Sequence, residues 1–204
     1  MKRPDNLKIS KVFSSGGDVH YVLPHFQREY TWDKEQWQVL LDDVFAIYDE
    51  FTEDNPPEHF MGSLVVINDN NMSNVFSVFK LVDGQQRLTT ISLMLCALER
   101  LVKDENAPLS KKLRKLLVNG DEQGDLHYKI LPTTKFGDRE AYIKIVDGGS
   151  PPKNDSKIPL SFQYIEAVLK KKIDAGVILP DRLFFILTNC LEVVFIDLNH
   201  DESP

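Results

Sequence analysis

The order of apolar and polar positions predicts a short strand followed by a long helix in the first quarter of the chain. Residues 20–24 form a β-rich run that ends at Pro24, because proline has no N–H to donate to a neighbouring strand. From Asp33 onward, apolar residues recur at helical spacing, and Gln36 completes a capping-box pattern. We therefore expect a helix with one buried face over residues 33–52.

The middle of the chain predicts two strands and then an apolar helix. Two β-rich runs, 60–68 and 75–82, are separated by the polar stretch DNNMSN, which suits a hairpin loop or a short connection. The strongly apolar segment 88–102 is too long for an average strand and fits a helix. Asp83 and Gly84, which precede this helix, form a pair that is common in tight turns.

The second half of the chain predicts mostly helices. The expected elements are helices over 109–118, 160–175 and 180–189, a loop over 119–124, and strands over 126–131 and 191–197. Residues 147–159 are rich in Gly, Pro and polar side chains, and we interpret them as a loop because the flanking pieces are too small to fold alone. No internal repeat is found.

Together these elements predict an α/β fold of the α+β kind, with a small mixed sheet and flanking helices. The 204 residues suit a single domain over 1–204 and can bury a core without disulfides or a structural metal. With 42% hydrophobic residues, the composition is globular, which excludes disorder and collagen-like repeats as descriptions of the chain.

The net charge of −7 argues against a protein that coats nucleic acid non-specifically, since that function needs clustered Lys and Arg. The charge is uneven. Residues 1–60 carry 6 basic and 12 acidic side chains, whereas residues 101–175 carry 14 basic and 11 acidic ones. The basic excess comes mainly from 111–115 and 170–172. Two interpretations are open for these runs: solvated helix faces, or a weak nucleic-acid contact surface.

Cysteine usage and hydropathy predict a cytoplasmic protein. Cys96 and Cys190 lie in apolar stretches without a CxxC pattern, so we expect buried free thiols in a reducing compartment. The longest apolar run, 93–98, is far shorter than the roughly 20 residues that span a bilayer. The charged start of the chain is not followed by the apolar region of a secretory signal. No membrane partner is expected.

The segment FKLVDGQQRLTTISLML carries the candidate chemistry because it predicts a strand, a tight turn and a helix in succession. A helix N-terminus exposes free N–H groups and the positive end of the helix dipole, which together attract anions. Gly84 allows a sharp turn and a close ligand, and Arg87 in the first helical turn can hold a phosphate with two hydrogen bonds. Gln85 and Gln86 can each donate and accept a hydrogen bond.

Asp83 is the only carboxylate in this motif and has several candidate roles. It can bind a metal, position a water or cap the helix. The alternative for the whole motif is an ordinary Asp-Gly turn with Asp83 as N-cap. Neither a P-loop nor a GxGxxG sequence occurs, so a bound nucleotide would not be held in either of those ways.

A second cluster, LPHFQREYTW, precedes the first long helix. Large polar and aromatic side chains crowd this short segment: Gln27, Arg28, Glu29, Tyr30 and Trp32. For its aromatic residues two interpretations are open, a binding site or packing under the helix. For Arg28 we favour a site, because a second arginine beside Arg87 would form a phosphate clamp.

Three motifs in order, PxFQRxYxW, FMGSLVV and LVDGQQRLTT, resemble the N-terminal DGQQR domain of GmrSD-type modification-dependent restriction enzymes. The matching positions are Pro24, Phe26, Gln27, Arg28, Tyr30, Trp32, Phe60, Met61, Gly62, Ser63 and residues 83–90. The resemblance implies a ParB-like core over about 1–105 with a mainly helical extension over about 106–204. It also implies that the domain binds and hydrolyses nucleoside triphosphates, coupled to recognition of modified DNA and to cleavage by a separate HNH nuclease domain.

The nuclease itself is not expected within these 204 residues. The five histidines are scattered and show no HNH or HxxH arrangement, so we interpret them as surface or packing residues. The HNH nuclease domain would then act in cis from a further part of a longer protein, or in trans from another chain.

We therefore expect a nucleoside triphosphate as substrate or ligand, with Mg²⁺ as an accompanying ion. The residues expected to be catalytic are Asp83, Gln86 and Arg87, with Asp83 also the candidate Mg²⁺ ligand, and those expected to bind the nucleotide are Gln27, Arg28, Tyr30, Gly84, Gln85 and Thr89.

Two rival functions use the same residues. In a non-enzymatic DNA-sensing module, the arginines would contact DNA phosphates. A nuclease centre at DGQQR is disfavoured, because metal-dependent phosphodiester cleavage usually needs several oxygen ligands and only one carboxylate is present.

Overall fold

A mixed β-sheet organises the fold in the computed structural model, which describes residues 5–14, 19–69, 77–120, 122–150 and 152–198. Within these ranges the sheet has six strands in the order β1-β6-β3-β4-β2-β5. The strands are β1 (Asp5–Lys8), β2 (Val19–Val22), β3 (His59–Asn68), β4 (Ser77–Asp83), β5 (Ile130–Leu131) and β6 (Leu191–Asp197). The β1/β6 and β3/β4 pairs are antiparallel and the other pairs are parallel.

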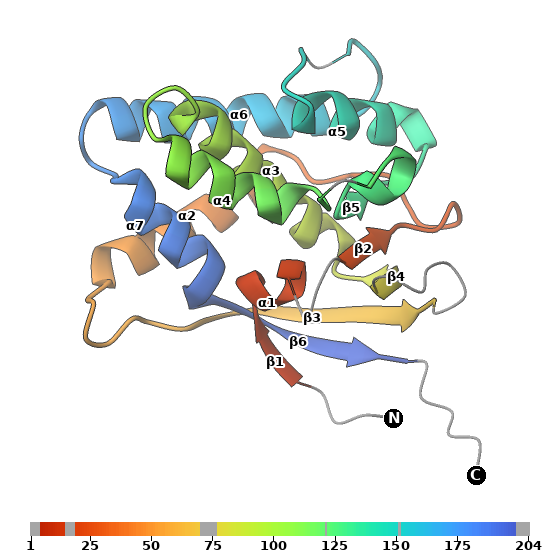
Figure 1. Ribbon diagram of the computed structural model, residues 1–204, viewed down its shortest axis with the longest axis horizontal. Helices are drawn as coiled ribbons and strands as arrows, with labels where there is room; N and C mark the ends of the chain where they lie inside the picture. The colour runs from red at the N-terminus through yellow and green to blue at the C-terminus, as the bar shows by residue number, and fades with distance from the viewer. Residues whose placement is uncertain (1–4, 15–18, 70–76, 121, 151, 199–204) are drawn as a thin grey trace.

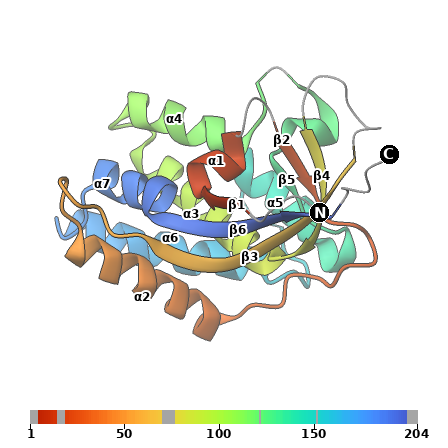
Figure 2. The same cartoon turned by 90° about the horizontal axis from the view of Figure 1, so that it is seen from below.

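Helices cover both sides of the long strands. They are α1 (Ile9–Ser14), α2 (Lys34–Glu50), α3 (Gln85–Val102), α4 (Ala107–Leu117), α5 (Asp138–Val146), α6 (Ile158–Asp174) and α7 (Pro180–Phe185). Helices α3, α4, α5 and α6 gather at one side of the molecule, with β1, β3 and β6 along the other (Figure 1). Viewed from below, α2 and α4 lie on opposite sides of β3 and β6 (Figure 2). None of the described helices is long and apolar enough to cross a membrane.

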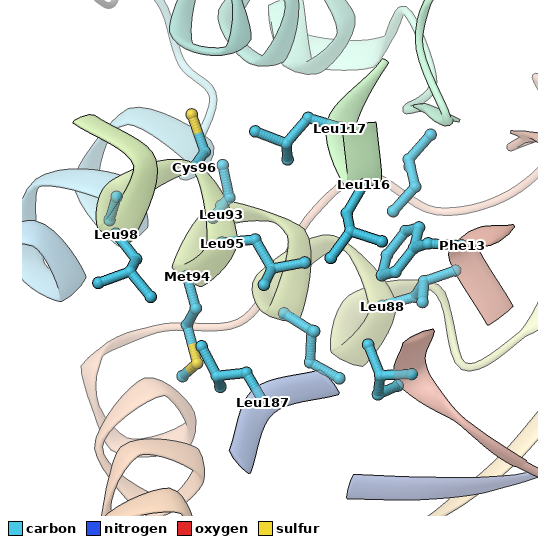
Figure 3. Packing of buried hydrophobic residues seen from close by; sticks show 14 of the residues in the cluster. Phe13, Leu88, Leu93, Met94, Leu95, Cys96, Leu98, Leu116, Leu117 and Leu187 are labelled. Carbon is cyan, nitrogen blue, oxygen red and sulfur yellow. The ribbon is translucent and has the colours of Figure 1, made fainter. Parts of the chain in front are cut away.

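Helix α3 is the centre of the hydrophobic core. Nearly all of its residues from Gln85 to Leu98 are buried, which is the pattern of a helix surrounded by other elements rather than an amphipathic surface helix. Its apolar side chains point outward in several directions and meet residues of neighbouring helices, as Met94 does near Leu187 (Figure 3). The N-terminus of α3 is consequently held in a fixed position at the end of β4.

The predicted α/β fold class is confirmed, and so are most of the predicted elements. The expected helix over 33–52 is α2, with Asp33 and Gln36 forming the capping box. Both cysteines are buried and free, as expected. The strands expected at 20–24, 60–68, 75–82 and 191–197 correspond to β2, β3, β4 and β6, and the helices expected at 88–102, 109–118, 160–175 and 180–189 to α3, α4, α6 and α7. Residues 70–76, 121 and 151 lie outside the described residues.

Several elements differ from the predictions. The strand expected at 126–131 is only the two-residue strand β5, which pairs with β2 through two residues. The start of the expected strand belongs to a 3-10 turn, Gly124–His127. The helix predicted to end at 189 stops as an α-helix at Phe185 and continues as a π-turn to Cys190. Strand β1 and helices α1 and α5 were not predicted. The boundary near residue 105 stays a prediction, although β5 and β6 join the same sheet as the earlier strands.

A buried histidine in β2 leads to a prediction about pH. His20 is 2% exposed, and its Nδ1 lies 2.7 Å from the carbonyl oxygen of Tyr128, so Nδ1 carries the donated proton. Burial lowers the pKa of His20 below its ordinary value of 6.5. Because the unfolded chain takes up the proton first, the free energy of unfolding should fall as pH drops below about 6.5, by roughly 1.4 kcal/mol for each unit of pKa difference.

The measurement is urea denaturation at pH 7 and pH 5. In His20→Asn the amide can still donate to Tyr128 but cannot titrate. The variant should therefore lose less stability than the parent between these two pH values. Equal losses of stability in both proteins would contradict the lowered pKa of His20.

Candidate functional site

A glycine makes the turn between β4 and α3 possible. Strand β4 ends at Asp83, Gly84 adopts a left-handed conformation with φ of 86°, and α3 begins at Gln85. A Cβ atom on Gly84 would lie 2.8 Å from the carbonyl oxygen of Ser63, so a larger residue would collide with β3. No side chain among the described residues caps α3. The alternative in which Asp83 is the N-cap is therefore wrong, and the first-turn N–H groups are free of a side-chain cap.

The FMGS motif on β3 is the platform for Arg87. Arg87 Nη1 donates to the carbonyl oxygen of Ser63 at 3.2 Å. At Gly62 φ is +98°, and a Cβ there would lie 2.8 Å from Arg87 Nη1. The pairing of β3 with β6 shifts register between Phe60 and Ser63, which marks an irregularity at this point. The guanidinium therefore rests against bare backbone, and among the described residues no carboxylate pairs with it.

Gln86 attaches the segment QREYTW to the start of α3. Its Oε1 accepts hydrogen bonds from the backbone N–H groups of Thr31 at 2.8 Å and Trp32 at 3.3 Å. Its Nε2 donates to the carbonyl oxygen of Glu29 at 2.9 Å. The side chain is 5% exposed and both ends of its amide are engaged. The geometry gives Gln86 a positioning role, and its expected catalytic role stays a prediction.

Tyr30 lies in the interior and anchors the segment QREYTW to the core. Its hydroxyl lies 2.6 Å from Thr90 Oγ1 and 3.1 Å from Ser161 Oγ, and it accepts from Trp37 Nε1 at 2.9 Å. Burial raises the pKa of Tyr30 to about 12. Of the two interpretations open for the aromatic residues of this segment, packing is the one that matches the position of Tyr30. Thr89, which is 2% exposed, is likewise inside the protein.

The structure brings the other seven predicted residues together around one pocket of about 210 Å³. We call it the DGQQR pocket, and it is lined by Gln27, Arg28, Trp32, Val82, Asp83, Gly84, Gln85, Gln86 and Arg87. Gln27 Nε2 donates to the carbonyl oxygen of Val82 at 3.0 Å, which holds the second cluster against the end of β4. Tyr30 and Thr89 are absent from this lining.

The DGQQR pocket is suited to an anion. Arg28 is exposed and, like Arg87, has no ion-pair partner within the part of the chain that the structure describes. The amide oxygen Oε1 of Gln85 is buried and accepts no hydrogen bond from the described residues. Asp83 supplies the single carboxylate of the lining. Two cations, a free helix N-terminus and one acid thus meet in a small space.

Within the described residues, protein side chains alone do not form a metal site. Among the described residues, no three His, Cys, Asp or Glu side chains are grouped so that they could hold a metal. Magnesium usually binds through one or two carboxylates together with waters and substrate phosphates. Asp83 therefore fits as one ligand of an ion that arrives with phosphates, and it does not suffice as a site by itself.

Residues from the second half of the chain also hold the pocket, and sequence reasoning missed them. The carboxylate of Asp138 accepts from the backbone N–H of Tyr30 at 2.6 Å, and burial raises its pKa. Lys157 Nζ donates to the carbonyl oxygen of Thr31, and Lys135 Nζ to that of Gln27. Their partners lie more than a hundred residues away, so no local spacing could have indicated these roles.

Comparison with known proteins identifies the family to which the chain belongs. The model of the GmrSD restriction endonuclease N-terminal domain matches residues 9–204 of the chain. No curated protein matches it. The matched range includes both clusters that line the DGQQR pocket, the FMGS platform and the helices of the second half. The chain therefore belongs to the family of GmrSD restriction endonuclease N-terminal domains.

Proposed function

We propose that this domain binds a nucleoside triphosphate in the DGQQR pocket and hydrolyses it as the regulatory step of a modification-dependent restriction system. Membership of the GmrSD family supports a role in a restriction system. The observation that carries the nucleotide proposal is that Arg28 and Arg87, which have no ion-pair partner among the described residues, line one pocket together with the first residues of α3. Phosphates are the common ligand of such an arrangement.

In this proposal each group of the pocket has a distinct task. Phosphate oxygens accept hydrogen bonds from the first-turn N–H groups of α3 and from Arg87. Arg28, an exposed residue of the lining, neutralises the charge that develops on the transferred phosphoryl group. Asp83, the one carboxylate among the described lining residues, positions the attacking water and would hold Mg²⁺, which would offset phosphate charge. Gln86 keeps Trp32 and its neighbours in place.

The family also suggests what the hydrolysis serves. We infer that nucleotide turnover is coupled to recognition of modified DNA and to cleavage by an HNH nuclease domain, supplied in cis or in trans. Within this chain the DGQQR pocket would then report nucleotide state to that partner.

A panel of ATP, GTP, CTP and UTP with Mg²⁺ tests the proposal. At a ligand concentration about 100 times Kd, linkage predicts roughly 2.7 kcal/mol of added stability, read as a rise in Tm, and phosphate release measures turnover. Arg28→Ala should lower phosphate release at least tenfold. Lys112→Ala, which removes an exposed cation from α4, should leave it unchanged.

The rival function, a non-enzymatic DNA-sensing module, predicts a different outcome. The same unpaired arginines would contact DNA phosphates, so modified duplex should bind without nucleotide and with a steep salt dependence. Tight nucleotide-free binding combined with no response to any triphosphate would replace our proposal with the rival.

A further inference from the structure

A second hollow adjoins the DGQQR pocket. This hollow, which we call the α2–β3 groove, has a volume of about 370 Å³, and its walls come from the first half of α2 and the start of β3. Trp32 and Arg87 line both the groove and the DGQQR pocket. The two spaces are therefore neighbours that share two side chains, an arrangement suited to one elongated ligand that contacts both.

Two apolar side chains in the walls of the groove are mostly exposed. Phe60 is 60% exposed and Val39 is 62% exposed, and the half-buried Trp32 lies beside them in the lining. Aromatic side chains left open next to a phosphate-binding pocket are suited to stack on a planar ring. A nucleobase is the planar part of a nucleotide and lies at the opposite end from its terminal phosphate.

The charge of the groove is opposite to that of the DGQQR pocket. Two carboxylates, Glu35 and Asp43, line it, and Asp43 Oδ2 lies 3.6 Å from His59 Nε2. Carboxylates repel phosphates, so the phosphate end of a nucleotide is directed toward Arg28 and Arg87. Ionised carboxylates only accept hydrogen bonds, so they favour a ring that presents N–H donors and disfavour one that presents carbonyl oxygens.

We propose that the α2–β3 groove is the base-binding part of the site and that Phe60, Glu35 and Asp43 select a nucleobase with an exocyclic amino group. This inference rests on the proposed nucleotide function and adds a specificity to it. The base stacks on Phe60, its amino group donates to a carboxylate of α2, and its phosphates pass Arg87 into the DGQQR pocket.

Matched nucleotide pairs test the amino group directly. ATP and ITP differ by an amino group in place of a carbonyl on the purine, and CTP and UTP differ in the same way on the pyrimidine. By calorimetric titration of the full chain, we expect the amino member of each pair to bind roughly tenfold more tightly, since one hydrogen bond to a charged group has about that value. In the Glu35→Gln, Asp43→Asn double variant, the new amides can donate to a carbonyl, so the difference should disappear or reverse.

Inorganic tripolyphosphate and Phe60→Ala separate this inference from the proposed function. Phe60→Ala should weaken every nucleotide roughly tenfold and leave tripolyphosphate binding unchanged, because only the base meets Phe60. If tripolyphosphate and all nucleotides bind equally well, and neither Phe60→Ala nor the Glu35→Gln, Asp43→Asn double variant changes their affinities, the base site is refuted and the phosphate site stands. If neither tripolyphosphate nor any nucleotide binds, both proposals are refuted.

Discussion

Replacing Arg87 with alanine should lower the affinity for a nucleoside triphosphate by 10- to 100-fold or more while leaving the fold intact. Charge-assisted hydrogen bonds contribute about 1.5–3 kcal/mol each, and every 1.4 kcal/mol is a factor of ten in affinity. Within the described residues the guanidinium makes a single hydrogen bond, to Ser63, and it is not fully buried. Its removal should therefore change the free energy of unfolding by no more than about 1 kcal/mol.

Calorimetric titration with Mg²⁺ and the tightest-binding nucleotide measures the affinity, and urea denaturation measures the stability. Arg87→Lys retains the charge but not the two-pronged geometry, so its affinity should fall between those of the parent and Arg87→Ala. An Arg87→Ala protein that folds normally and binds nucleotide like the parent would exclude the DGQQR pocket as the phosphate site.

The elements that the sequence predicted well are those specified by local patterns. Helix α2 has an amphipathic stripe and a capping box, and α3 has a long apolar run after an Asp-Gly turn. Strand β1 and helix α1 have neither signal. Four residues form β1 only because β6, which lies almost 190 residues later, offers it an antiparallel edge. Such an element depends on tertiary pairing, which no window of sequence contains.

The candidate site shows the same division. The turn, Gly84 and Arg87 were predicted because they are neighbours in sequence, and the structure places them at the N-terminus of α3. The positioning role of Gln86 was not predicted, and packing was only one of two open interpretations for Tyr30, because each role depends on a partner from elsewhere in the chain. A glutamine next to a turn gives no sign of whether its amide faces a ligand or holds a backbone segment. The sequence named most of the residues that line the pocket. Only the fold shows which of the named residues hold the pocket in place instead of facing a ligand.

Gly62, which lies against the guanidinium of Arg87, is the position of the second prediction with a large expected effect. Gly62→Ala should lower nucleotide affinity roughly tenfold and cost about 1–2 kcal/mol of stability. The stability falls because an L-residue is strained at φ of +98°. The affinity falls because the new Cβ would lie 2.8 Å from Arg87 Nη1, and the end of a flexible side chain moves more easily than the backbone. The displaced guanidinium then no longer faces the phosphates.

Gly148→Ala is the matched control, since Gly148 has φ of +80° with no atom within 4 Å of the added Cβ. It should lose comparable stability and no affinity, which separates backbone strain from displacement of the guanidinium. A double-mutant cycle tests the contact itself. In the Arg87→Ala background, Gly62→Ala should have no further effect on affinity, because the group it displaces is gone. Additive losses would mean that Gly62 acts on the pocket by a route other than Arg87.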